Sequence, residues 1–319
     1  MIRWVAVTVD TAPEPGTTLQ EHVLPQLDPR APADVDALMR ELVARSPAAA
    51  ADVETRVSIT FDPSLSAQRH GDPDEKVAEV GRILAGLESA LGSCGVTVLG
   101  KATADDLAAV VRGAFDPVAR GEVERLLASP SHQREVLLDW SSAGPVAAEE
   151  SWDRYRHDSG VSVSWGWHEP PRQQVTSGVL TRLLSPGRYG KRVTILYRAL
   201  SAAESARILE SQVNAAAFRD AYRKAQRRDE TARDAADRIR AQQAAREEAQ
   251  GAGVVLMSVY VTATVGDERD LSAAVADIEA RAEQSKIRVR RLFGSQAAGF
   301  AATLPAGVHP AHLATRGRR

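Results

Sequence analysis

The chain has 319 residues, and its 40 Lys and Arg against 42 Asp and Glu give a formal net charge of −2 at pH 7. A chain so close to neutrality is not held to nucleic acid by bulk charge, so only a local basic patch could bind it. Aromatic residues make up 5% of the chain, which excludes an array of base-stacking side chains. No stretch approaches the ~20 consecutive apolar residues of a membrane-spanning helix. Composition therefore predicts a globular chain that is itself soluble.

Cys94 is the single cysteine, which excludes an intrachain disulfide and any CxxC metal or redox site. It follows an apolar helical stripe and precedes a predicted strand, so we expect its thiol to be packed and inert. The seven histidines are scattered, and His309 and His312 have no carboxylate beside them. The sequence therefore predicts no metal site.

The first third of the chain alternates strand patterns with helix patterns. The predicted strands are 2–10 (IRWVAVTVD), 55–62 and 95–99. The predicted helices are 35–45, 73–92 and the segment that Thr103 caps. This alternation predicts an amino-terminal α/β domain over 1–115 with a covered sheet. Residues 116–150 are less regular and are interpreted as a connecting segment, with a short helix at 120–127, a strand at 136–140 and a boundary at Gly144-Pro145.

A second α/β domain is predicted over 151–307, followed by a tail at 308–319. Its strands are expected at 160–168 (GVSVSWGWH), 192–199, 254–265 and 287–293, with helices at 175–184 and after Asp267. The β–α–β–α–β order of 192–293 matches ferredoxin-like sheets. The expected fold class is α/β (α+β): two ferredoxin-like α/β sandwich domains in tandem, with a long charged helix in the second.

That helix is predicted from the segment between Lys191 and Gln250, which contains neither Gly nor Pro. Ser201 and Glu204 form a capping-box pattern, and the helix is expected over about 201–250. Its first half has an apolar stripe and its second half is rich in charged residues. We expect either one projecting arm or two helices with a frayed joint. The Arg-rich second half is balanced by carboxylates, which favours a solvated helix over a nucleic-acid surface.

Two surfaces are candidates for protein contacts: the Trp-rich strand 160–168 and the long helix. Tryptophan and arginine are the residues that most often anchor protein interfaces. The candidate interaction residues are Trp165, Trp167, Arg223, Arg227, Arg228 and Arg238.

The sequence contains no complete catalytic motif. Residues 95–101 have the spacing GxxxxGK, but Ala102 stands where a phosphate loop needs Ser or Thr, and the intervening residues are strand formers. His157-Asp158-Ser159 has the residue types of a catalytic triad, but adjacent side chains cannot converge as its relay requires, so we interpret it as a turn. The sequence thus predicts no catalytic residue, cofactor or metal.

Three stretches carry a resemblance to a known family: WDRYRHDSGVSVSWGWHEPPRQQV (152–175), RVTILYRALSAAESARILE (192–210) and IRVRRLFGSQAAGFAATLPAG (287–307). The chain resembles membrane-tethered subunits of actinobacterial conjugation and secretion loci. It is also similar to the amino-terminal, motor-less domain of type IV secretion ATPases of the TrbE/CagE class. The resemblance covers about 150–307 well and 1–115 loosely, and its closing part rests on Gly294, Gln296, Phe300, Thr303, Leu304 and Pro305.

The resemblance implies a non-enzymatic assembly subunit of a conjugative or secretion machine. Its partners would be a motor ATPase, membrane subunits or further copies of itself, and it would lie at the cytoplasmic face of the cell membrane. The sequence opens within a predicted strand, whereas the family begins with transmembrane segments, so we expect the membrane attachment upstream of residue 1. Two alternatives remain: a nucleotide-dependent enzyme that uses Lys101, and a DNA-handling protein that uses the Arg-rich helix.

Overall fold

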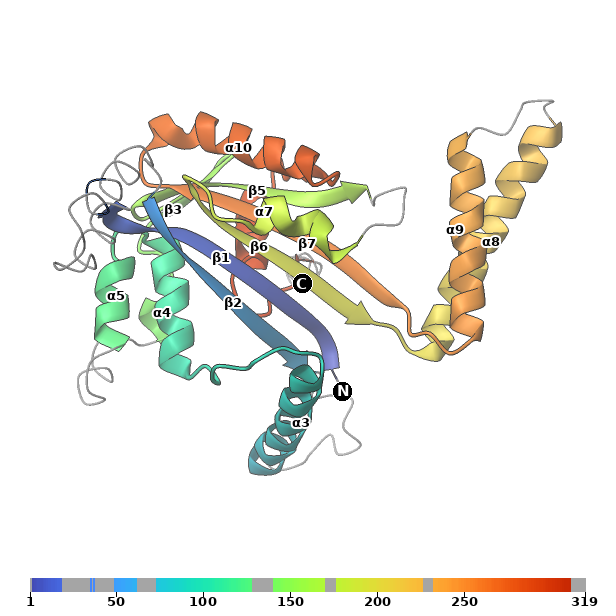
Figure 1. The fold of residues 1–319 in the computed structure, drawn as a ribbon, viewed down its shortest axis with the longest axis horizontal. Coiled ribbons are helices and arrows are strands. Elements are labelled where there is room, and N and C mark those ends of the chain that lie inside the picture. The colour runs from blue at the N-terminus through green and yellow to red at the C-terminus, as the bar shows by residue number, and fades with distance from the viewer. Residues whose placement is uncertain are drawn as a thin grey trace.

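The fold is taken from a computed structural model, which describes residues 2–18, 35, 37, 49–61, 73–127, 140–169, 176–225 and 232–310. The described residues form a mixed α/β structure built on one 8-stranded sheet (Figure 1). The strands are β1 (Ile2–Thr18), β2 (Ala49–Phe61), β3 (Ala148–Glu150), β4 (Tyr155–His157), β5 (Gly160–Glu169), β6 (Gly190–Ala199), β7 (Val255–Val265) and β8 (Arg288–Arg291). Their order is β2-β1-β6-β7-β5-β4-β3, with β8 also paired to β5.

The sheet runs without a break across the predicted domain boundary. Strand β1 pairs antiparallel with β6, from Val5 opposite Tyr197 to Thr11 opposite Lys191. Strand β6 in turn pairs with β7, and β7 with β5. Two tandem ferredoxin-like domains are therefore not confirmed, because the strands of both halves share one sheet. Sequence periodicity located most of these strands but carried no information on which strand pairs with which.

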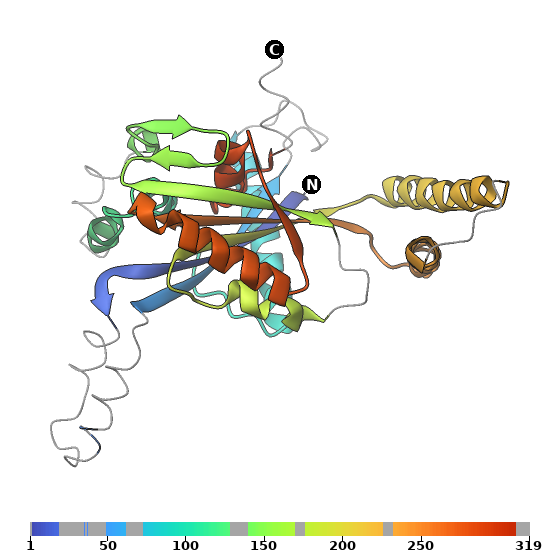
Figure 2. The ribbon, with the colours of Figure 1, turned by 90° about the horizontal axis from the view of Figure 1, so that it is seen from above.

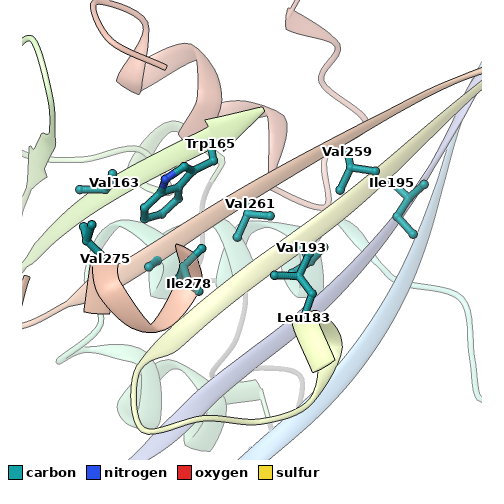
Figure 3. Packing of buried hydrophobic residues seen from close by; sticks show 10 residues of the cluster. Val163, Trp165, Leu183, Val193, Ile195, Val259, Val261, Val275 and Ile278 are labelled. Carbon is teal, nitrogen blue, oxygen red and sulfur yellow. The ribbon is translucent and has the colours of Figure 1, made fainter. Parts of the chain in front are cut away.

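One face of the sheet packs the main hydrophobic core. Alternation along β5, β6 and β7 places Val163, Trp165, Val193, Ile195 and Val261 on this side, all nearly inaccessible to solvent (Figure 3). Two helices cover it: α7 (Thr181–Leu184), which follows the 3₁₀ turn η4 (Ser177–Leu180), and α10 (Leu271–Gln284), which follows η5 (Glu268–Asp270). Burial of these branched and aromatic side chains is the main force that holds β5, β6 and β7 together.

The opposite face, called the polar face, is rich in hydroxyl side chains, and Trp4, Ala6 and Leu196 form a small apolar cluster on it. It lies against α4 (Ala104–Phe115), α5 (Arg120–Leu127) and α11 (Gln296–Ala302). Thr103 caps α4 with a capping box to Asp106, as its sequence pattern predicts. Helix α11 and the short strands β3 and β4 were not predicted, because each is too short for periodicity to reveal. Of the predicted strand 136–140 the structure describes only Trp140, which begins the 3₁₀ turn η3 (Trp140–Ser142) and is not in a strand. Residues 136–139 lie outside the described part.

Residues 95–99 are not a strand. Helix α3 (Pro73–Ser93) ends in a turn in which the amides of Cys94, Gly95 and Val96 bond back to carbonyls of its last residues. Gly95 has a φ of 78°, a left-handed conformation typical of a helix end. The chain then runs as an exposed connection, in which Leu99 is 98% exposed. Cys94 lies in this turn and is exposed, so the expectation of a packed thiol is wrong.

A single long helix over 201–250 is not confirmed. The segment instead contains α8 (Ala202–Ala225) and α9 (Ala232–Ala249), which pack against each other. Ser201 and Glu204 form the predicted capping box at the start of α8. We call α8 and α9 together the arm; it extends away from the end of the sheet (Figures 1 and 2). Because β6 and β7 pair with each other, the arm is an insertion at the tip of a β-hairpin.

Candidate functional site: a buried polar face and a projecting arm

Hydroxyl side chains line the polar face of the sheet. Side chains alternate along a strand, so the same pleat that points the valines of β5 and β7 into the core points their Ser and Thr residues to the other side. The hydroxyls meet across neighbouring strands at 2.8 Å, in the pairs Thr8–Thr194, Ser164–Thr262 and Ser162–Thr264. These cross-strand pairs satisfy buried polar groups and fix the register of the strands.

Helix α11 lies on this polar face at very short range. The side chain of Gln296 is fully buried and accepts the Ser164 amide at 2.7 Å. A Cβ placed on Gly299 would come within 2.6 Å of Leu292 Cδ1 and of Ser164 Cβ. Only a residue without a side chain allows this approach. Gln296 and Phe300 belong to the residues that carry the family resemblance, and here they hold α11 against the sheet.

His157 is the centre of a buried hydrogen-bond chain. Its Nδ1 lies 2.6 Å from the carbonyl oxygen of Phe115, which accepts only, so Nδ1 carries the proton. Its Nε2 then accepts the Ser162 hydroxyl at 2.7 Å. Burial lowers the pKa of His157 from 6.5 to about 4, with the nearby Arg192 acting in the same direction and the bond to Phe115 opposing it. His157 is therefore neutral at physiological pH.

A serine hydroxyl donating to a neutral imidazole is the arrangement of a nucleophile with its general base. Ser162 and His157 are nevertheless both 0% exposed. A nucleophile needs access to its substrate, and the orienting group here is a backbone carbonyl instead of a carboxylate. The geometry therefore supports a structural role for this pair: it joins β4, β5 and the end of α4.

The turn between β4 and β5 is the predicted turn at His157-Asp158-Ser159, and its side chains fasten it to α4. Asp158 has a φ of 32°, and its carboxylate accepts the amides of Val146 and Ala147, both at 2.9 Å. Its other oxygen lies 2.9 Å from the guanidinium of Arg112. The Asp158 carboxylate thus holds the connection before β3 close to Arg112 of α4.

Asp116 completes this cluster from the end of α4. Ser159 donates to its carboxylate, and Arg112 does so at 2.8 Å. Burial acts to raise the pKa of Asp116, but the hydrogen bonds from Ser159, the Ala119 amide and Arg112 lower it overall. The carboxylate is thus ionised at neutral pH and serves as an anchor.

Arg192 on β6 is a buried charged side chain whose hydrogen-bonding groups are incompletely satisfied among the described residues. It is 5% exposed, and its Nε and Nη2 atoms have no hydrogen-bond partner. Its guanidinium lies over the Phe300 ring, 4.7 Å from the centroid. Asp10, directly opposite on β1, instead pairs with Arg120 at 3.3 Å. Burial lowers the pKa of Arg192 to about 10, so the side chain keeps its charge.

The predicted interaction residues fall into two groups. Trp165 is 1% exposed and packs in the main core, so it cannot serve as a surface contact, and that expectation is wrong for it. The paired strands β7 and β8 flank β5 on both sides there and α10 covers it, which strand periodicity could not show. Trp167 is half-buried against the same core and donates to the Glu169 carbonyl at 2.6 Å.

Two of the four Arg candidates lie on the arm. Arg223 lies in α8 and the partly exposed Arg238 in α9. Arg227 and Arg228 fall outside the described residues. Within α9, Arg240 pairs with Asp237 on the same helix, and Gln243 donates to Glu247 at 2.8 Å. These local pairs are typical of a solvated helix and do not indicate a basic surface for DNA.

The GxxxxGK segment has no phosphate-binding geometry. It is an exposed connection, and Lys101 pairs with Glu88 at 3.3 Å. Helix α4 begins only at Ala104, so its amino-terminal amides do not follow the second glycine directly, as they do in a phosphate loop. Across the described ranges, the His, Cys, Asp and Glu side chains form no group of three or more that could hold a metal ion.

The arm exposes apolar side chains where it could meet a partner. Phe218 on α8 is 71% exposed and Ile239 on α9 is 58% exposed. At the base of the arm, Val255, Leu256 and Met257 at the start of β7 are 48%, 41% and 43% exposed. Sequence periodicity missed these residues, because exposure there follows from how far the arm extends beyond the sheet.

Neither a protein-family model nor a curated protein matches the chain. Among the described residues, the structure contains no helix with both the length and the apolar character needed to cross a membrane.

Proposed function

We propose that this chain is a non-catalytic assembly subunit of a conjugative or secretion machine, and that the arm is its docking element. The observation that carries the docking role is the arm itself, two packed helices inserted at the tip of the β6–β7 hairpin that extend beyond the sheet (Figure 2). Phe218 and Ile239 are exposed on it. Large apolar side chains on a projecting element are typical of a surface that a partner covers.

The assignment to a secretion or conjugation apparatus is supported by the resemblance of residues 152–175, 192–210 and 287–307. Three residues of the last stretch are buried: Gln296 bonds to Ser164 of the sheet, and Phe300 and Leu304 pack with Ala114 of α4. In this proposal the sheet is the rigid body and the arm reaches a motor ATPase or a membrane subunit at the cytoplasmic face of the membrane.

The buried polar face supports a structural role over a catalytic one. Its serine–histidine pair is inaccessible, its carboxylates are engaged by Arg112 and Arg120, and the Lys101 segment has no cradle for phosphate. A nucleotide-dependent enzyme and a DNA-handling protein therefore have less support than a docking subunit.

The experiment is an arm-less variant. The Leu200 amide donates to the Val254 carbonyl at 3.0 Å, so the two ends of the arm meet and can be joined by an Asn-Gly turn in place of 201–253. We expect this variant to keep its fold by circular dichroism and to lose its complex with the motor ATPase encoded in the same locus when the two are co-expressed. A folded arm-less variant that binds the motor as well as the parent chain would contradict the proposal.

A further inference from the structure

One edge of the sheet is formed by β2, a 13-residue strand, and the other by β3. In the part of the chain that the structure describes, β2 pairs on one side with β1 and with no strand on the other. Residues 53, 54, 55 and 57 are exposed, with Val53 at 50% and Val57 at 43%. A long edge strand with open backbone groups is a template for pairing with another chain.

Three of the features that usually prevent edge pairing, Pro, Lys and a central bulge, are missing from β2. Ala49–Phe61 contains neither Pro nor Lys, and the irregular positions in its register with β1 lie only near the ends, leaving the stretch from Thr60 to Ala51 regular. The apolar-core helices α7 and α10 pack on β5, β6 and β7. The valines of β2 on that side therefore remain open to solvent beside an open edge.

The centre of β2 reads Val53-Glu54-Thr55-Arg56-Val57, a pattern that is its own complement when reversed. Two copies that pair edge to edge and antiparallel are related by a two-fold axis perpendicular to the sheet, which keeps each face on its own side. Because side chains alternate between faces, opposite residues must share a face, so the axis passes through a residue and not between two.

Only one position of the axis near the centre sets both Glu54 and Arg56 opposite a residue of opposite charge. With the axis at Thr55, Glu54 of each copy lies opposite Arg56 of the other. An axis at Glu54 or at Arg56 places two like charges directly opposite each other, and an axis at Val53 sets Glu54 against Asp52. Opposite charges across a strand pair stabilise it and like charges destabilise it.

The other face of the same register pairs the exposed valines. With the axis at Thr55, Val53 of each copy meets Val57 of the other, and each pair removes apolar surface from water. Both faces therefore favour the same register independently. Glu54 remains near Arg120, at 3.8 Å, so its side chain is already held on the polar side of the strand.

We propose that two copies of this chain associate through β2, antiparallel and centred on Thr55, so that their sheets join into one. The inference does not rest on the arm, which lies at the tip of the β6–β7 hairpin. A failure of this interface would leave the docking proposal standing, and the arm-less variant should still dimerise.

The first test is the mass of the chain by sedimentation equilibrium over a range of concentrations. We expect a monomer–dimer equilibrium that Glu54→Arg or Arg56→Glu weakens by about tenfold, because each change creates two like-charge pairs. Mixing the two variants should restore the dimer as a heterodimer, since every opposite pair is then of opposite charge. The matched control is Arg288→Glu, which reverses a residue of an exposed ion pair on β8 and should leave dimerisation unchanged.

The second test fixes the register by cysteine cross-linking in a Cys94→Ser background, which removes the exposed native thiol. Thr55→Cys should form a disulfide-linked dimer on mild oxidation, because directly opposite residues lie about 5 Å apart at Cα. Val57→Cys alone should not, since its two copies would be about 13 Å apart. Val57→Cys mixed with Val53→Cys should cross-link. A monomer at all concentrations, or equal cross-linking of Val57→Cys alone, would overturn the proposal.

Discussion

Trp4 and Gly307 are 303 positions apart in the sequence and are joined by a hydrogen bond, in which the indole Nε1 donates to the glycine carbonyl at 2.8 Å. The same carbonyl accepts the Thr60 hydroxyl at 3.3 Å, and Ser58 donates to the Pro305 carbonyl at 2.6 Å. The segment after α11 is thus hydrogen-bonded to both β1 and β2. The two halves of the chain are thus joined by hydrogen bonds between residues far apart in the sequence.

Fragments 1–150 and 151–319 should therefore not fold when expressed separately, and the full chain should unfold in a single transition. The reason is that, among the described strands, β1 and β2 pair with each other and only β1 reaches a further strand, β6, which belongs to the second fragment. Heteronuclear NMR of each fragment and urea unfolding of the full chain provide the measurement. Trp4→Phe, which removes the hydrogen bond and part of a buried ring, should lower the free energy of unfolding by at least about 1 kcal/mol. A well-dispersed spectrum from either fragment alone would show that the halves are independent.

His157 should make the protein sensitive to acid. Its pKa is 6.5 when unperturbed and about 4 when folded, so the unfolded chain binds the proton more readily. Its contribution to stability is complete above pH 6.5 and is lost as the pH falls towards 4. The difference amounts to about 3 kcal/mol in the free energy of unfolding.

This contribution is measured by urea unfolding of the parent chain and of His157→Gln from neutral pH downwards. The variant should lose the part of the pH dependence that lies between 6.5 and 4. His168→Gln changes an exposed histidine on the same strand pair and should leave the profile as it is. An identical slope in the parent and in His157→Gln would show that His157 is not buried in its neutral form.

Arg192→Met should leave the free energy of unfolding unchanged or raise it. The guanidinium is buried with Nε and Nη2 unpartnered, and an apolar side chain of similar volume avoids that desolvation. Arg120→Met is the contrasting variant, because it removes the ion-pair partner of the buried Asp10 and should destabilise by about 3 kcal/mol. The free energies of unfolding of the parent chain, Arg192→Met and Arg120→Met are compared by thermal and urea unfolding. A loss from Arg192→Met as large as that from Arg120→Met would mean that Arg192 has a stabilising partner.

The sequence located most elements but not their arrangement. Alternation in β1, β5, β6 and β7 is strong because one face of each strand enters a core, and the caps at Thr103 and Ser201 act through nearby residues. Residues 95–99 have the same alternation without a core to meet, so local preference there was overridden. Pairing of β1 with β6 depends on residues about 190 positions apart, which periodicity cannot detect.

The same limit applies to the site. Trp165 was proposed as a surface contact from its residue type, whereas burial depends on α10 and on the strands that flank β5. Phe218 is exposed because α8 lies beyond the end of the sheet (Figure 1). No local sequence pattern shows where a helix lies relative to the end of a sheet. His157 could be recognised only as part of a turn, since its partners Phe115 and Ser162 come from two other elements.

The docking role of the arm is tested most directly by a photo-crosslinking amino acid at Phe218, introduced into the chain at its native level in cells. Phe218 is 71% exposed on the arm, and Leu99, 98% exposed on the connection before α4, is the matched control. We predict that Phe218 yields a discrete cross-linked product containing the motor ATPase or a membrane subunit of the same locus, and that Leu99 does not. No product from Phe218, or the same product from both positions, would contradict the account.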